Sequence, residues 1–157
     1  MNRREGVALA ACLAVGFAAA ALGSVATASS VGGWYRSLVK PPWTPPDWVF
    51  GPVWTLLNAA MGVAAWLVWR STATVRKRAL ALFAVQLGLN VAWSRLFFAL
   101  RRIDLALVEM AALWVAIALI LMAFAGASSA AAWLLAPYLA WVSFAAVLNA
   151  VLLRLNP

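Results

Sequence analysis

The stretch Trp34 to Trp54 reads W-Y-R-S-L-V-K-P-P-W-T-P-P-D-W-V-F-G-P-V-W and separates the first apolar run of the chain from the second. It holds four tryptophans, five prolines and two basic residues. A long connection without regular structure usually carries function, and the paired prolines restrict its backbone to extended geometry. The stretch therefore predicts a shaped loop that covers one end of a helical bundle and leads into the next helix.

The rest of the chain consists mainly of long apolar runs. Hydrophobic residues fill 67% of the 157 positions and charged residues only 10%, against about half and about a quarter in soluble domains. A helix needs about 20 apolar residues to cross a bilayer, which gives five spans here. They are expected at residues 6–28, 45–69, 79–100, 105–125 and 130–153, with a structured loop at 29–46. We therefore predict an all-α fold, a single domain of residues 1–157 that forms an integral membrane bundle of five transmembrane helices.

The same composition argues against several classes of protein. The chain has no His and one Cys, so neither a Cys/His metal cluster nor an internal disulfide is expected. Its formal charge of +8 comes from basic residues that flank the spans, which favours contact with lipid head groups over nucleic acid. These residues divide six against six between the two sides of the membrane, so the positive-inside rule predicts neither orientation.

The first span allows a second interpretation. Arg3 and Arg4 precede an apolar run that ends at Ala26-Thr27-Ala28, and this arrangement also resembles a secretory signal peptide with its cleavage site. The run is longer than the roughly 7 to 15 residues usual for the apolar core of a signal peptide. A retained helix is therefore favoured.

The quoted stretch also predicts where the second span begins. Thr44 is expected as the N-cap, with Pro45 at the first helical position and Asp47 near the positive end of the helix dipole. The tryptophans alone fit an ordinary aromatic belt at the membrane interface. A belt does not explain the paired prolines, so a structured cover over a pocket is the favoured interpretation.

Three spans carry side-chain amides and aromatic rings at helical spacing, so each set shares one face of its helix. The sets are Phe50, Trp54, Asn58 and Met61; Gln86, Asn90, Trp93 and Phe97; and Tyr138, Trp141, Ala145 and Asn149. Such residues either line a mostly apolar pocket or form hydrogen bonds between helices, worth about 0.6 kcal/mol each. For any single Asn the two explanations are equal, and the repetition on three helices favours a pocket.

Two further features concern the third and fourth spans. Glu109 is an ionisable group within the fourth span, either a functional residue or, as we favour, an interfacial one paired with Arg102 or Arg95. Ala84 and Gly88 form a small-xxx-small pair that allows two backbones to approach closely. They are the candidate dimer interface, although an Ala-rich chain produces this pattern readily.

Three ordered motifs between Trp34 and Asn149 carry a family resemblance that covers nearly the whole chain, from about residue 6 to 157. They are Trp34-Tyr35, Leu38, Lys40-Pro41, Trp43-Thr44-Pro45-Pro46, Trp48 and Phe50-Gly51-Pro52-Val53-Trp54; Gln86-Leu87, Asn90, Trp93-Ser94 and Phe97-Phe98; and Pro137-Tyr138, Trp141, Phe144-Ala145 and Leu148-Asn149. Together they resemble the TspO/MBR family, the tryptophan-rich sensory proteins of bacteria. That family is related to the mitochondrial translocator protein, also called the peripheral benzodiazepine receptor.

The resemblance implies a membrane protein, usually a homodimer, that binds porphyrins, sterols and benzodiazepine-type drugs under its first loop. A multi-pass protein of a bacterial cell membrane is therefore expected, with protoporphyrin IX or haem as ligand and no obligatory cofactor. Trp54 and Trp141 match tryptophans associated with light-dependent porphyrin breakdown, and they are catalytic candidates only if this chain has that activity. The expected ligand-binding residues are Trp34, Lys40, Trp43, Phe50, Trp54, Asn58, Asn90, Trp93, Phe97, Tyr138, Trp141, Ala145 and Asn149. Arg36 or Lys40 is expected to meet the porphyrin propionates.

The chain also departs from the family pattern. Asn58 stands where many members have Tyr, and residues 148–154 lack the aromatic residue of the cholesterol-recognition consensus. That consensus is weak, and its absence lowers the expectation of sterol binding. Because the chain has no His, a metal-free porphyrin, or haem held without histidine, is favoured over a cytochrome-like site.

Three functions from different classes remain open at this point. A binding protein or sensor for tetrapyrroles is favoured, with light-dependent oxidative degradation or transport of porphyrin or sterol as alternatives. A conventional enzyme is disfavoured because the expected pocket offers no His, no reactive Cys and no paired carboxylates. A transporter usually contains internal repeats, which five helices cannot form in equal halves.

Overall fold

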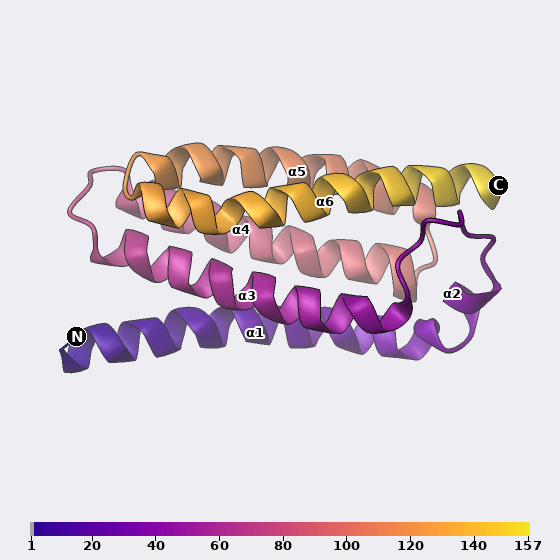
Figure 1. Cartoon of the computed structure of the whole chain (residues 1–157), viewed down its shortest axis with the longest axis horizontal. Helices are drawn as coiled ribbons and strands as arrows, with labels where there is room; N and C mark the ends of the chain where they lie inside the picture. Colours follow the sequence, from indigo (N-terminus) through magenta and orange to yellow (C-terminus); the bar gives the residue numbers. More distant parts are fainter. Residues whose placement is uncertain (1) are drawn as a thin grey trace.

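Five long helices run side by side, joined by three short connections and by one longer segment between α1 and α3 (Figure 1). The computed structural model describes residues 2–157, apart from the side chain of Ser29. The helices are α1 (Arg3–Val31), α2 (Trp34–Ser37), α3 (Asp47–Arg70), α4 (Arg76–Ser94), α5 (Ile103–Ala125) and α6 (Ser129–Leu155), and α4 continues into a π-helical turn, η1 (Arg95–Ala99). All except the short α2 are long and apolar enough to span a membrane, which confirms the five predicted spans.

Helix caps and short loops define the bundle. Asn2 caps α1 by accepting from the Glu5 backbone N–H, while the Glu5 side chain accepts from the Asn2 backbone N–H. Ser128 caps α6 through the backbone N–H of Ala131. The connections 71–75, 100–102 and 126–128 are so short that successive helices run antiparallel.

The helices close into a ring in the order α1, α3, α6, α5, α4, with α4 packed back against α1. One close approach in this ring joins α1 to α3 at Gly62. A Cβ atom added at Gly62 would lie 2.7 Å from Leu13 Cδ2 and 3.0 Å from Leu13 Cα. Side chains that are almost fully buried, among them Met61, Phe124 and Tyr138, fill part of the space inside the ring.

The Trp/Pro-rich stretch is more ordered than the sequence predicts. Helix α1 extends to Val31 and α2 follows after the Gly32-Gly33 turn, so the longest irregular part of the stretch is residues 38–46. The prediction that Thr44 caps the second span is wrong: α3 begins at Asp47, and its N-cap, Pro46, makes no side-chain capping bond. Thr44 instead closes a turn, because its backbone N–H and its Oγ1 both donate to the Pro41 carbonyl, at 3.0 and 2.8 Å. Thr44 and Pro45 each precede a proline, which disfavours helical geometry at both positions.

The charged residues of the fourth span also differ from expectation. Arg102 forms a bidentate pair with Asp104, with an Nη2 to Oδ2 distance of 2.6 Å. Both carboxylate oxygens of Glu109 are buried and have no hydrogen-bond partner among residues 2–157. The predicted pairing of Glu109 with Arg102 or Arg95 is therefore wrong, because Arg102 is already bound by a carboxylate two positions away.

Candidate functional site

A cavity of about 390 Å³ opens inside the ring at the end that carries α2. Helices α1, α3, α4, α5 and α6 all contribute to its wall, together with α2 and η1. Its size falls in the usual range for small-molecule sites, roughly 300 to 1,000 Å³. The predicted site residues that line it are Phe50, Trp54, Asn58, Asn90, Trp93, Phe97, Trp141, Ala145 and Asn149. The three faces that the sequence predicts therefore converge.

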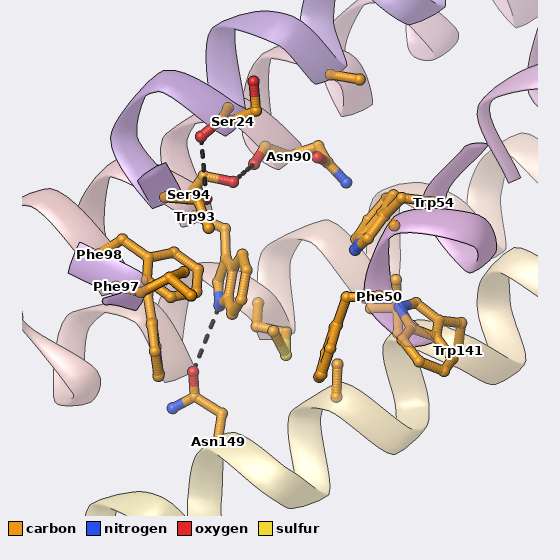
Figure 2. Close-up of a pocket in the computed structure, with 18 of the residues that line it drawn as sticks. Ser24, Phe50, Trp54, Asn90, Trp93, Ser94, Phe97, Phe98, Trp141 and Asn149 are labelled. Carbon is orange, nitrogen blue, oxygen red and sulfur yellow. Dashed lines mark hydrogen bonds between the residues drawn. The ribbon is translucent and has the colours of Figure 1, made fainter. Parts of the chain in front are cut away.

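Aromatic rings form two groups that face each other across this cavity (Figure 2). On one side Trp93 stacks on Phe97, with ring centroids 5.2 Å apart and planes inclined by 24°. On the other side Phe50 packs edge-on against Trp141 at 5.8 Å, next to Trp54. The space between the two groups suits a flat, apolar ligand.

The π-helical turn η1 supplies part of the first group. It presents Phe97 and Phe98 together, and the hydroxyl of Ser30 donates to the Phe98 carbonyl at 2.6 Å. The Leu100 backbone N–H donates to the Arg95 carbonyl at 2.9 Å, the long-range bond of a π-turn. Such turns occur frequently at functional sites. Phe98, which the sequence reasoning did not select for the site, belongs to the cavity wall.

Asn149 fixes one aromatic side chain. Its Oδ1 accepts from Trp93 Nε1 at 3.4 Å, and its Nδ2 donates to the Ile103 carbonyl at 3.0 Å. The residue is 1% exposed, so the whole amide is buried in the wall. Asn149 thus holds the Trp93 indole and joins α4, α5 and α6.

A second hydrogen-bond chain lies deeper in the bundle. Asn90 Nδ2 donates to Tyr138 Oη at 3.0 Å, and Tyr138 Oη donates to Gln86 Oε1 at 2.9 Å. Gln86 Nε2 in turn lies 3.8 Å from Met61 Sδ, which is a weak acceptor. Because the Gln86 nitrogen faces this sulfur, the Gln86 oxygen faces Tyr138 and accepts its hydrogen bond. With its amide nitrogen engaged, Asn90 keeps its Oδ1 without a hydrogen-bond partner in the described part of the chain.

Asn58 shows the same division between its two polar atoms. Its Nδ2 donates to the Trp54 carbonyl at 2.7 Å, and no residue from 2 to 157 donates to its Oδ1. Asn58 and Asn90 both line the cavity. Two amide oxygens are therefore available to a ligand that carries N–H or O–H donors.

Four of the expected ligand-binding residues, Trp34, Lys40, Trp43 and Tyr138, are not part of the cavity wall. Trp34 packs behind Phe97 at 5.6 Å, and Lys40 donates from Nζ to the Tyr35 carbonyl. Tyr138 supports the wall through Trp54, with ring centroids 6.2 Å apart. Ligand contact by these residues stays a prediction.

Residues at the two ends of the 38–46 loop reach the cavity instead. Tyr35, from α2, and Asp47, the first residue of α3, both line it. Burial raises the pKa of Tyr35, and the nearby Asp47 carboxylate raises it further, so the phenol stays neutral.

The sequence reasoning overlooked the contribution of α1 to the wall. Phe17, Ala20, Ser24 and Thr27 line the cavity, spaced by three or four residues. This spacing is a helical face, but its small residues carry no chemical signal until neighbouring helices are placed around them.

Comparison with known proteins decides the family. The model of the TspO/MBR family matches residues 8–155, nearly the whole chain. The chain belongs to the TspO/MBR family. It is 46% identical to the tryptophan-rich protein TspO of Chlorobaculum tepidum, over 93% of this chain and 91% of that protein. It is 43% identical to TspO of Archaeoglobus fulgidus, over 93% and 92%, and 43% identical to the translocator protein of Homo sapiens, over 78% and 75%.

The candidate dimer residues of this TspO/MBR chain, Ala84 and Gly88, are exposed on α4. A Cβ atom added at Gly88 would meet nothing within 4 Å. The surface is therefore open to a second copy, and the homodimer stays a prediction.

Proposed function

We propose that this TspO/MBR protein is a membrane binding protein or sensor for tetrapyrroles and other flat apolar ligands, with protoporphyrin IX or haem as the ligand. It would act in porphyrin homeostasis or stress regulation in a bacterial membrane. The observation that carries the proposal is the pair of aromatic groups, Trp93 with Phe97 and Phe50 with Trp141, facing each other across one cavity.

The chemistry of a porphyrin fits this arrangement. Stacked and edge-on contacts between its flat ring and indole or phenyl rings favour binding. Each aromatic pair contributes about 0.5 to 1.5 kcal/mol beyond the burial of apolar area. The porphyrin propionates need cations, and Arg36 is exposed on α2, next in sequence to Tyr35, which lines the cavity. Because the sequence has no His, the proposal favours a metal-free porphyrin or haem without a histidine ligand.

A titration in the dark tests binding. Protoporphyrin IX added to the purified protein should quench tryptophan fluorescence to saturation. Trp141→Ala, which removes a ring from the wall, should raise Kd about tenfold, equivalent to roughly 1.4 kcal/mol. Trp133→Ala is the matched control, since that indole is 77% exposed and outside the cavity wall. Absence of saturable quenching, or equal Kd values for the two variants, would refute the proposal.

Light-dependent oxidative degradation of porphyrin is the second candidate function. It is favoured by one observation: Trp54 and Trp141 both line the same cavity, on the same side of it. The bound complex should then lose porphyrin absorbance under illumination, and Trp54→Phe or Trp141→Phe should abolish the loss. Quenching of tryptophan fluorescence without loss of porphyrin absorbance would support binding and refute degradation.

A further inference from the structure

The irregular loop 38–46 is tied to the end of α6 by one side chain. Asn156, which follows the last residue of α6, accepts from the Val39 backbone N–H through Oδ1 at 2.9 Å. Its Nδ2 donates to the Val39 carbonyl at 3.0 Å and to the Leu152 carbonyl at 2.9 Å. Figure 1 shows the C-terminal end of α6 next to this loop.

These contacts use every polar atom of the amide. A primary amide has one acceptor oxygen and two N–H donors, and all three are engaged here. The two bonds to Val39 repeat the exchange between neighbouring residues of an antiparallel sheet. An Asp of the same shape keeps the acceptor but loses both donors, and it places a negative oxygen against two carbonyls.

The other hydrogen bonds of the loop within the described chain are local, and at its far end the Pro46 carbonyl accepts from the Val49 N–H of α3 at 2.9 Å. Lys40 donates to Tyr35 and Thr44 donates to Pro41, so both bonds stay within the segment or its near end. The one ring contact from the loop to α6 is Trp43 against Phe144, at 5.8 Å. Leu38 also packs against a cluster that includes Leu148 and Leu152 of α6, and Lys40 Nζ lies 4.4 Å from the centroid of the Tyr35 ring. Release of Asn156 would therefore remove the hydrogen bonds between the loop and α6 and leave apolar and ring contacts to hold it.

Asn156 and the loop that it holds also lie close to the cavity. The loop connects Tyr35 to Asp47, and both of these residues line the cavity. Leu152, whose carbonyl orients the Asn156 amide, lines it too and is 2% exposed. The amide thus joins the loop to α6, a helix that contributes to the cavity wall.

We propose that Asn156 is a positioning residue that latches loop 38–46 against the end of α6, beside the cavity, and so controls the rate at which ligands enter and leave. The proposal rests on the proposed binding function for its biological meaning. The bonds to Val39 are exposed to water, which makes them weak enough to open and reclose.

A cysteine inside the cavity reports opening without any ligand. In a Cys12→Ala background, Ala145→Cys places a thiol on the cavity wall, and its reaction rate with a water-soluble thiosulfonate measures access. Asn156→Asp and Asn156→Ala should each raise this rate about tenfold. Asn2→Asp is the matched control, because it makes the same chemical change at the cap of α1, at the far end of the bundle.

Asn156→Asp and Asn156→Ala in the otherwise unchanged protein are then loaded with protoporphyrin IX, and its dissociation is followed by recovery of tryptophan fluorescence. Dissociation should be about tenfold faster in both Asn156 variants than in the wild type. Unchanged labelling rates in correctly folded Asn156 variants would overturn the latch, as would faster labelling with an unchanged dissociation rate. If the wild type binds no porphyrin while the Asn156 variants label faster, the proposed ligand is wrong and the latch stands.

Discussion

Replacing Tyr138 by Phe tests whether the buried hydrogen-bond chain stabilises the bundle. The Tyr138 hydroxyl accepts from Asn90 Nδ2 at 3.0 Å and donates to Gln86 Oε1 at 2.9 Å, and the residue is 1% exposed. The substitution removes one oxygen atom and leaves the ring in place. The Gln86 oxygen, in a side chain that is 1% exposed, then loses its hydrogen-bond donor.

The expected decrease in the free energy of unfolding follows from the two hydrogen bonds that the Tyr138 hydroxyl makes. Hydrogen bonds between membrane helices contribute about 0.6 kcal/mol on average and at most about 1.7. Two such bonds give a decrease of about 1 to 3 kcal/mol in the free energy of unfolding. Reversible unfolding of the purified protein in mixed micelles, monitored by circular dichroism, measures this difference.

Tyr35→Phe is the matched control for this measurement. Tyr35 is 6% exposed, and its hydroxyl makes no hydrogen bond to residues 2–157, so the same atom is removed without loss of a bond. Tyr35→Phe should change stability by less than about 0.5 kcal/mol. Equal stabilities for Tyr138→Phe and Tyr35→Phe would show that the Asn90–Tyr138–Gln86 hydrogen bonds do not stabilise the fold, and would refute the prediction.

Three further substitutions test other contacts by the same unfolding assay. Glu109→Gln should raise the free energy of unfolding, because both carboxylate oxygens are buried without a partner among the described residues and a neutral amide costs less to bury. A decrease in stability would contradict this and indicate that Glu109 has an ion partner. Gly62→Ala should cost about 1 to 3 kcal/mol, since its methyl group would lie 3.0 Å from Leu13 Cα, whereas Gly16→Ala, with nothing closer than 3.5 Å, should be neutral or stabilising. Arg101→Gly should stabilise by up to about 1 kcal/mol, because Arg101 has a φ of 55°, and an unchanged or lower stability would contradict that explanation.

The spans and the converging faces could be predicted because they depend on local periodicity. Whichever neighbours surround a helix, residues three or four apart share a face, so Asn90 and Trp93 had to point the same way. Their order along the chain was enough to predict an aromatic and amide wall. The cavity lined by both residues confirms that convergence.

Other parts of the site could not be predicted, because they depend on tertiary neighbours. Ala20 and Ser24 of α1 become cavity wall only because α3 and α4 lie opposite them. The π-helical turn that turns Phe98 inward has no sequence signature of its own. Glu109 was assigned an arginine partner from nearness along the chain, although Arg102 forms its bonds with Asp104.

The sequence offered two explanations for the amides, ligand contact or bonding between helices, and the structure divides them atom by atom. Asn149 uses both of its polar atoms within the protein, so it positions Trp93 rather than a ligand. Asn58 and Asn90 use only their nitrogens, and each leaves an oxygen without a partner among residues 2–157 on a residue that lines the cavity. A ligand that displaces water from the cavity must supply a donor to these oxygens, because an acceptor left without a hydrogen bond costs free energy. Ligand preference should therefore respond to Asn58 and Asn90, and wall rigidity to Asn149.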